Sequence, residues 1–341
     1  MSIKAEIRKK LAGFTLDISL ESQEGVIGLL GPSGCGKTMT IRCIAGIEQP
    51  DEGFIEINGR VVFDSKRKIN IPARNRRTGI MFQNYALFPH MSVKRNLETG
   101  ILKEAKTARE ERIYKVCEML QITEHLKKYP RELSGGQQQR VALGRILVME
   151  PEIIMLDEPF SALDRSMRIN LEDKICEVLK EFEKSVIYIS HDPDEIYGYC
   201  DSVALFENGR IGAFGPKRAI FENPVWVGGG RLVGIRNIFE IEASGAERYI
   251  SGCGVKLEGA GEGYAFVGVP SGAACISRGG DGVEASVLKV RPSPGSYGVT
   301  AVTDSGAEFA IECAEEFFEG ERVRIKIDTS RVIMLKKDTG V

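Results

Sequence analysis

Residues 31–38, GPSGCGKT, decide the fold of this chain, because they fit the pattern G-x-x-x-x-G-K-[ST] at every fixed position. A continuous apolar run, VIGLL at 26–30, precedes them and is typical of a strand buried on both faces of a parallel sheet. An apolar-periodic segment at 39–47 follows and predicts a helix. Strand, glycine-rich loop and helix in this order predict the first unit of an α/β domain.

The spacing within this loop has a chemical reason. Backbone N–H groups of such a loop point inward and cradle phosphates, and its glycines let the backbone bend and approach closely. The helix that begins near Lys37 directs its positive end at the same anion. Lys37 would hold the β and γ oxygens of ATP, and the Thr38 hydroxyl would bind Mg²⁺. The predicted nucleotide-binding residues are Gly31, Pro32, Ser33, Gly34, Cys35, Gly36, Lys37 and Thr38.

A second element, IIMLDEP at 153–159, places two carboxylates at the end of another buried strand. We expect Asp157 to hold Mg²⁺ through water and Glu158 to orient or deprotonate the attacking water. An acidic pair after a strand is often only a helix cap or a surface turn. The glycine-rich loop elsewhere in the chain favours the catalytic interpretation here.

Alternating strands and helices extend this pattern over residues 1–230. Residues 53–63 predict a hairpin that turns at Asn58-Gly59, and residues 84–150 are mostly helical in pattern. A helix is expected at 171–182 and a further buried strand at 186–190. These elements predict an α/β nucleotide-binding domain of the P-loop class, with a largely parallel sheet and a helical subdomain at about 84–150.

The composition changes after about Trp226, where glycine becomes frequent and short β-type runs take over. Five runs are bounded by turn residues and predict strands; they are 285–290, 299–303, 308–313, 322–327 and 331–335. Residues 231–341 are therefore expected to form a small all-β barrel domain.

Bulk properties exclude several classes of function. The chain has 341 residues and a formal net charge of −2, so it lacks the global basic field expected of a protein that binds nucleic acid, while a local basic patch stays open. Its eight cysteines form no CxxC pair and are expected to be buried thiols in a reducing compartment. The N-terminus has no signal pattern and no apolar run reaches the ~18 residues of a spanning helix. We therefore expect a cytosolic protein whose contact with a membrane goes through a partner.

The segment LSGGQQQR at 133–140 closely resembles the signature of ATP-binding-cassette (ABC) proteins. Locally, the same segment predicts a helix that begins after an N-cap at Ser134. The resemblance continues in the order of the family: Gln83 in IMFQNYALFPH resembles the Q-loop glutamine, SALD at 161–164 the D-loop, and His191 the switch histidine. It covers roughly residues 3–225.

The resemblance implies a mechanism in which two copies face each other head to tail. ATP on the loop of one copy meets the signature of the other, whose backbone N–H groups and helix start reach the γ-phosphate. Nucleotide contacts are thereby implied for Ser134, Gly135, Gly136, Gln137 and Asp164. Catalytic roles are implied for Glu158, His191 and Gln83, with Gln83 also near Mg²⁺.

Membrane partners follow from the same resemblance. Transmembrane permease subunits would dock beside the Q-loop, and a periplasmic or extracellular substrate-binding protein would join the complex. The ATPase would then lie peripherally on the cytoplasmic face of the membrane. Four apolar side chains could form the docking surface or the core of the helical subdomain; they are Tyr85, Leu87, Phe88 and Met91. Leu11 stands where the family commonly stacks an aromatic ring on adenine, with Phe14 three residues later.

Residues 231–341 resemble the accessory oligonucleotide-fold (TOBE) domain of importer ATPases. The chain as a whole is most similar to the ATPases that import molybdate or tungstate, and sulfate, ferric-iron, sugar and polyamine importers share much of the pattern. The β domain could sense an oxyanion or simply stabilise a dimer. Two other classes stay open: a non-transport ABC ATPase, and an oxyanion-binding protein with an inactive cassette.

Overall fold

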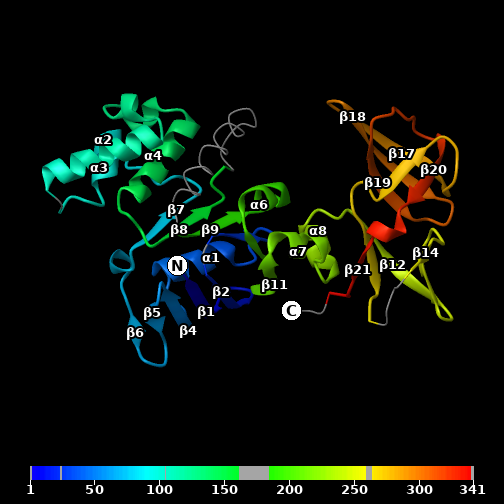
Figure 1. Ribbon diagram of the computed structural model, residues 1–341, viewed down its shortest axis with the longest axis horizontal. Helices are drawn as coiled ribbons and strands as arrows, with labels where there is room; N and C mark the ends of the chain where they lie inside the picture. The colour runs from blue at the N-terminus through cyan, green and yellow to red at the C-terminus, as the bar shows by residue number, and fades with distance from the viewer. Residues whose placement is uncertain (1, 24, 104, 161–183, 259–262, 339–341) are drawn as a thin grey trace. The chain divides into compact units, whose positions relative to one another are not determined.

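The computed structural model describes residues 2–23, 25–103, 105–160, 184–258 and 263–338. The chain forms two compact units, 1–217 and 218–341 (Figure 1). The composition predicts a division near residue 230, whereas the first compact unit ends at Lys217. No helix of the described residues is long and apolar enough to cross a membrane.

A six-stranded sheet forms the centre of the first unit, in the order β11-β10-β3-β9-β8-β7. All neighbours pair in parallel except β11, which runs antiparallel to β10. The strands are β3 (Val26–Leu30), β7 (Thr78–Met81), β8 (Ile153–Asp157), β9 (Ser185–Ser190), β10 (Ser202–Glu207) and β11 (Arg210–Pro216). Every residue of β3, β8 and β9 is buried. This explains their continuous apolar runs and confirms the predicted parallel sheet.

A second sheet of the first unit is antiparallel, in the order β2-β1-β4-β5-β6. Its strands are β1 (Ile3–Lys10), β2 (Thr15–Ser22), β4 (Glu52–Ile57), β5 (Arg60–Asp64) and β6 (Ile69–Asn70). The predicted hairpin joins β4 to β5, and Asn58 and Gly59 have φ of 51° and 77°, as a two-residue turn of this kind requires. Helix α1 (Lys37–Ala45) contributes to one hydrophobic core with side chains from both sheets, which fixes the start of the helix beside the carboxyl end of β3.

Arg76 holds the other end of α1. Its side chain is only 1% exposed, and its guanidinium donates to the carbonyl oxygens of Cys43 and Ile44 at 2.8 and 2.9 Å. It also donates to the Ile71 carbonyl at 2.7 Å and to the Asn70 side chain at 3.0 Å. A cation at the carboxyl end of a helix complements the helix dipole, so Arg76 stabilises the C-terminal end of α1.

The region predicted to be mostly helical contains α2 (Val93–Glu98), α3 (Lys106–Met119), α4 (Gly135–Leu147) and two 3-10 turns at Thr123–His125 and Pro130–Glu132. Residues 84–92 are an exception, because Tyr85 and Ala86 adopt positive φ angles of 57° and 44°. The buried Asn96 side chain holds this segment through hydrogen bonds to the backbone of Phe88, Met91 and Ser92. The helix predicted at 171–182 lies outside the described residues.

Three short helices lie between strands: α6 (Pro193–Tyr199) follows β9, and α7 (Lys217–Glu222) and α8 (Val227–Leu232) follow β11.

The second unit has two antiparallel five-stranded sheets, in the orders β14-β13-β12-β15-β21 and β16-β20-β17-β18-β19. Both sheets contribute to one hydrophobic core. This confirms the predicted all-β domain of barrel type.

The strands of the first of these sheets are β12 (Asn237–Ser244), β13 (Glu247–Ile250), β14 (Lys256–Leu257), β15 (Phe266–Val269) and β21 (Ile333–Leu335). Those of the second are β16 (Ala274–Ser277), β17 (Val283–Ser293), β18 (Ser296–Thr303), β19 (Glu308–Cys313) and β20 (Arg322–Ile327). The five predicted runs correspond to β17–β21. Strands β12–β16 lie in and beside the glycine-dense part of the sequence and were not predicted.

Candidate active site

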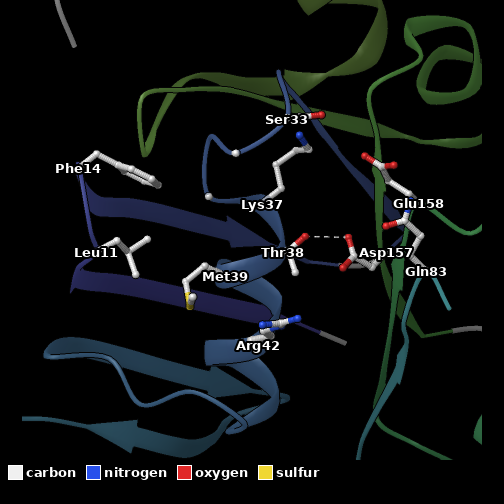
Figure 2. Close-up of a pocket in the computed structure, with 12 residues that line it drawn as sticks. Leu11, Phe14, Ser33, Lys37, Thr38, Met39, Arg42, Gln83, Asp157 and Glu158 are labelled. Carbon is white, nitrogen blue, oxygen red and sulfur yellow. Dashed lines mark hydrogen bonds between the residues drawn. The ribbon is translucent and has the colours of Figure 1, made fainter. Parts of the chain in front are cut away.

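A cavity of about 460 Å³ opens at the carboxyl ends of the parallel strands (Figure 2). Its walls come from the glycine-rich loop, the first turns of α1, the ends of β7 and β8 and the β1–β2 connection. The lining residues are Leu11, Phe14, Ser33, Gly34, Gly36, Lys37, Thr38, Met39, Arg42, Gln83, Asp157 and Glu158. Seven of the fifteen residues predicted for nucleotide or metal therefore line one space, together with the predicted catalytic residue Glu158.

The loop reaches the cavity because two of its glycines have backbone angles that other residues rarely adopt. Gly34 has φ of 81° and Gly36, the N-cap of α1, has φ of 110°. A Cβ on Gly36 would lie 2.8 Å from Leu16, so the close approach also needs glycine. Helix α1 has neither an acidic residue in its first turn nor a side-chain cap at Gly36. Its N-terminus is thus suited to an anion.

Lys37 places a cation beside this N-terminus. The side chain is 5% exposed, and its ammonium donates to the carbonyl oxygens of Gly31 and Pro32 at 2.7 and 2.9 Å. The Cys35 sulfur lies 3.7 Å from the same nitrogen, and burial is the main cause that raises the pKa of that thiol. The loop therefore carries a fixed positive charge and a protonated thiol.

Asp157, the last residue of β8, faces the start of α1. The Thr38 hydroxyl donates to its carboxylate at 3.0 Å, as the dashed line in Figure 2 shows. Burial raises the pKa of Asp157, and the neighbouring Glu158 raises it further, while the Thr38 hydrogen bond lowers it. A partly desolvated carboxylate paired with a hydroxyl is the oxygen donor set that Mg²⁺ prefers.

Arg42 also lines the cavity and was not predicted. It lies four residues after Thr38, one turn along α1, and its charge lowers the pKa of Asp157. The i, i+4 spacing from Thr38 is the signal that could have found it.

Glu158 and His191 lie together although 33 positions separate them in the sequence. The His191 Nδ1 is 3.4 Å from the Glu158 carboxylate, because β8 and β9 are parallel neighbours and both residues follow their strands. The Glu158 N–H donates to the Ile189 carbonyl at 3.1 Å and fixes this register. Gln83 follows β7, the next strand of the sheet, and lines the same cavity as Glu158. The structure thus brings the three predicted catalytic residues to one edge of the sheet.

The opposite end of the cavity is apolar. Leu11, Phe14 and Met39 line it, on the side away from Asp157 (Figure 2). The Leu11 N–H donates to the Phe14 carbonyl at 2.9 Å, so both predicted adenine neighbours belong to one tight turn between β1 and β2. An apolar end and an anion-binding end match the two halves of a nucleotide.

The signature segment begins α4. Ser134 is the N-cap: its hydroxyl accepts the Gln137 N–H at 3.4 Å, and the Gln137 side chain accepts the Ser134 N–H at 2.9 Å. This capping box confirms the local helix-start interpretation. Ser134 and Gly135 are exposed, and within the described part of the chain residues 134–137 do not line the 460 Å³ cavity. Asp164 lies outside the described residues.

A second groove, of about 440 Å³, lies beside the segment that follows Gln83. Arg145 of α4 donates to the carbonyls of Ala86 and Tyr85 at 2.7 and 3.2 Å, and its guanidinium lies 5.4 Å from the Phe88 ring centroid. Tyr85 is buried, whereas Phe88 is 40% exposed and lines the groove together with Met149. The predicted docking residues therefore divide between core and surface.

The donor set fits Mg-ATP. The loop offers glycine backbone and a helix N-terminus, Lys37 offers a buried cation, and Thr38 with Asp157 offers two oxygen atoms for a hard cation. The cavity lies within the ~300–1,000 Å³ typical of small-molecule sites. Phosphate-bound Mg²⁺ and a triphosphate are thus the groups for which these residues are suited.

Comparisons with known proteins show the family to which this chain belongs. A family model described as ABC transporter matches residues 15–161. A ferric-iron import ATP-binding protein of Mannheimia succiniciproducens is 31% identical over 332 residues, 94% of this chain and 93% of that protein. The solved dimeric structure of a bacterial ABC transporter cassette superposes with a TM-score of 0.54 at 25% identity, over 63% of this chain and 99% of that one. The chain therefore belongs to the ABC transporter family, among its import-type ATP-binding proteins.

Other relatives match a smaller share of the chain. A molybdenum import ATP-binding protein of Paramagnetospirillum magneticum is 40% identical over 219 residues, 64% of this chain. A trehalose/maltose import ATP-binding protein of Thermococcus litoralis is 40% identical over 212 residues, 61% of this chain. The aligned parts are 60% and 57% of the lengths of these two relatives. Relatives named for different solutes are thus similar to this chain to the same degree.

Proposed function

We propose that this chain is the ATP-binding and ATP-hydrolysing subunit of an importer. One observation carries the proposal: the loop lysine, the Thr38–Asp157 pair and the Glu158–His191 pair lie at the carboxyl edge of one parallel sheet. Each member supplies a different requirement of phosphoryl transfer, namely charge, metal ligands and a group that orients water.

The chemistry is divided among these side chains. Lys37 stabilises negative charge on the transferred phosphoryl group, and Thr38 and Asp157 supply oxygen ligands to Mg²⁺, with Gln83 beside them. Bound Mg²⁺ supplies further neutralisation of the triphosphate. Glu158 accepts a hydrogen bond or the proton from the attacking water. His191, 3.4 Å from Glu158, contacts the γ-phosphate and keeps Glu158 oriented.

The active form is a homodimer in which the turn at Ser134–Gly136 covers the nucleotide of the partner subunit. Two features support it: Ser134 and Gly135 are exposed at the N-terminus of a 13-residue helix, and the 460 Å³ cavity lies elsewhere on the same chain. An exposed helix N-terminus favours an anion. A solved cassette of similar fold is described as dimeric.

Transmembrane permease subunits bind the groove formed by Ala86, Phe88, Arg145 and Met149, which places the chain peripherally on the cytoplasmic face of the membrane. Phe88 and Met149 are 40% and 47% exposed there, and an apolar segment of a partner would cover them. The segment at 84–92 begins next to Gln83, so the groove and the nucleotide cavity share one stretch of backbone. A substrate-binding protein would join through the permease.

Molybdate or tungstate is the cargo that we propose, with sulfate, ferric iron, sugars and polyamines as alternatives. The overall resemblance and the molybdenum import relative support this cargo. Relatives named for trehalose/maltose and for Fe³⁺ have the same sequence identity to this chain. An oxyanion bound by the C-terminal, TOBE-like domain stays a prediction. The small cavity at Arg236 carries Glu312 3.6 Å away, and a carboxylate there opposes an anion.

Replacement of Glu158 by glutamine tests the hydrolytic role. The amide keeps the shape but cannot accept a proton, so we expect ATPase activity of the purified chain to fall by about 100-fold or more. ATP-dependent dimerisation, measured by light scattering, should persist or strengthen. Glu152, which pairs with Arg77 on the surface, offers the control Glu152→Gln, which should retain activity. Full hydrolysis by Glu158→Gln would contradict the proposed role.

A transport assay tests the cargo. The chain with its permease and binding-protein partners would be reconstituted in vesicles, and ATPase stimulation measured with molybdate, tungstate, sulfate, Fe³⁺, maltose and spermidine. Stimulation by molybdate and tungstate alone supports the proposal, and stimulation by another solute replaces it. Co-purification with nucleic acid instead of a membrane subunit would favour the non-transport class.

A further inference from the structure

His191 lies in the short turn between Ser190, the last residue of β9, and Asp192, the N-cap of α6. The His191 side chain is 61% exposed, so packing against neighbours contributes little to its orientation. Its distance from Glu158 must depend on how firmly the backbone on either side is held. The structure shows that both flanking residues are tied into hydrogen bonds.

A buried carboxylate holds the first of them. Glu195 of α6 is 8% exposed, and its Oε2 accepts the Ser190 hydroxyl at 2.6 Å. The Tyr188 hydroxyl donates to the same oxygen at 3.0 Å. Hydrogen bonds to a buried carboxylate group are among the stronger ones in proteins, because little water competes for them.

Ser190 connects Glu195 to the other side of the turn through two hydrogen bonds. Its single hydroxyl proton is used in the bond to Glu195, so the oxygen lone pairs can accept, and the Asp192 N–H donates to them at 3.0 Å. Ser190 is 2% exposed, so water does not replace either bond. Continuous hydrogen bonds therefore link Glu195 to Ser190 and Ser190 to Asp192, on both sides of His191.

The second flank is fixed independently. The Asp192 side chain accepts the Asp194 N–H at 2.9 Å and so caps α6, and its carbonyl accepts the Ile196 N–H at 3.3 Å. On the opposite side of the pair, the Glu158 N–H donates to Ile189, the residue before Ser190. Glu158 and His191 are therefore held against the same two residues of β9.

We propose that Glu195 is a positioning residue that acts through Ser190 to keep the His191 imidazole within reach of Glu158 and the γ-phosphate. The inference rests on the proposed function, since it assumes that His191 takes part in hydrolysis. The competing explanation is that Glu195 and its two hydroxyl partners only stabilise the join of β9 and α6. The two hydroxyls separate these explanations, because the Ser190 hydroxyl also accepts the Asp192 N–H of the turn.

The test compares Ser190→Ala with Tyr188→Phe in the full chain. Each variant removes one hydroxyl from the same carboxylate, and only Ser190→Ala also frees the Asp192 N–H. We expect Ser190→Ala to lower kcat by about 10- to 100-fold, since small displacements of a catalytic group have effects of that size. KM for Mg-ATP should stay within about twofold. Tyr188→Phe should keep kcat within about threefold of the wild-type value, and Ser190→Thr, which retains the hydroxyl, should restore most of the loss.

A double variant provides the readout that a merely structural role would not move. In a His191→Ala background there is no imidazole to position, so adding Ser190→Ala should not lower kcat further. Wild-type kcat in Ser190→Ala, equal losses in Ser190→Ala and Tyr188→Phe, or additive losses in the double variant would each overturn the inference. If His191→Ala alone retained full kcat, or the wild-type chain hydrolysed no ATP, the proposed function would fail instead.

Discussion

Replacement of Arg76 by methionine removes the buried guanidinium that holds the carboxyl end of α1. Four acceptors lose their donor, and one of them, the Cys43 carbonyl, also accepts the Gly46 N–H at 3.1 Å. Asn70 is exposed, so water can replace its lost donor, whereas the Ile44 and Ile71 carbonyls would each cost about 1 to 1.5 kcal/mol. The first unit should therefore lose about 2 to 3 kcal/mol of stability, with some of the loss offset by the buried methionine side chain.

The neighbouring residue supplies a matched control. Arg77 is paired with Glu152 at 3.3 Å, and its side chain is 63% exposed, so Arg77→Met should cost at most about 1 kcal/mol. Both substitutions exchange an arginine for an unbranched side chain of similar length. The difference between them isolates burial and the helix contact from the loss of one positive charge.

Urea unfolding gives the measurement. Circular dichroism at 222 nm follows the first unit, which contains the longest helices, and the single tryptophan, Trp226, reports on the second unit by fluorescence. We expect the Arg76→Met midpoint in circular dichroism to fall by about 1 M or more, for slopes of about 1–3 kcal/mol/M. The Trp226 transition serves as an internal control. A loss below about 1 kcal/mol, or one equal to that of Arg77→Met, would refute the reasoning.

Three further predictions concern the cavity and the thiols. Burial raises the pKa of Asp157, so its ionised form disfavours the folded nucleotide-free state, and stability falls as pH rises through the folded pKa. The Asp157→Asn variant should therefore be more stable than the wild-type chain at pH 8 by about 0.5–2 kcal/mol in calorimetry, and this difference should vanish toward pH 4. The same variant should lose ATP hydrolysis. Phe14→Ala and Leu11→Ala should raise KM for ATP several-fold with kcat within about twofold, and an unchanged KM in both would argue against an adenine site at this end. Burial raises the pKa of Cys43 to about 12, so iodoacetamide at pH 8 should label exposed Cys275 at least about 100-fold faster, as peptide mass spectrometry would show; equal labelling would contradict the burial.

Much of the first unit could be predicted because its parallel strands are buried on both faces. Such strands read as continuous apolar runs, and the residues that follow them gather at one edge of the sheet. That rule predicts Asp157 and Glu158 at this edge, and the family resemblance adds His191, which lies 3.4 Å from Glu158 in the structure. Their catalytic roles stay predictions.

The rest depended on information that sequence patterns do not carry. Three arginines, 74, 76 and 77, look equally solvated in the sequence, and only the packing of α1 places Arg76 in the interior. Segment 84–92 is apolar, yet two consecutive left-handed residues and the Asn96 side chain give it a non-helical path. In the second unit, strands such as β14, with two residues, are too short for any periodicity to show.

The capping box at Ser134 has a consequence for how substitutions there should be read. The hydroxyl oxygen accepts an N–H from its own helix, which leaves the hydroxyl proton free to point outward. Aspartate is as good an N-cap as serine, so by helix propensity alone the exchange looks harmless. Aspartate has no proton to offer and would turn a negative charge toward the triphosphate of the other subunit in the proposed dimer. A folded, well-capped helix that repels its partner's nucleotide would be the result, so stability alone is a poor guide to tolerance at this position.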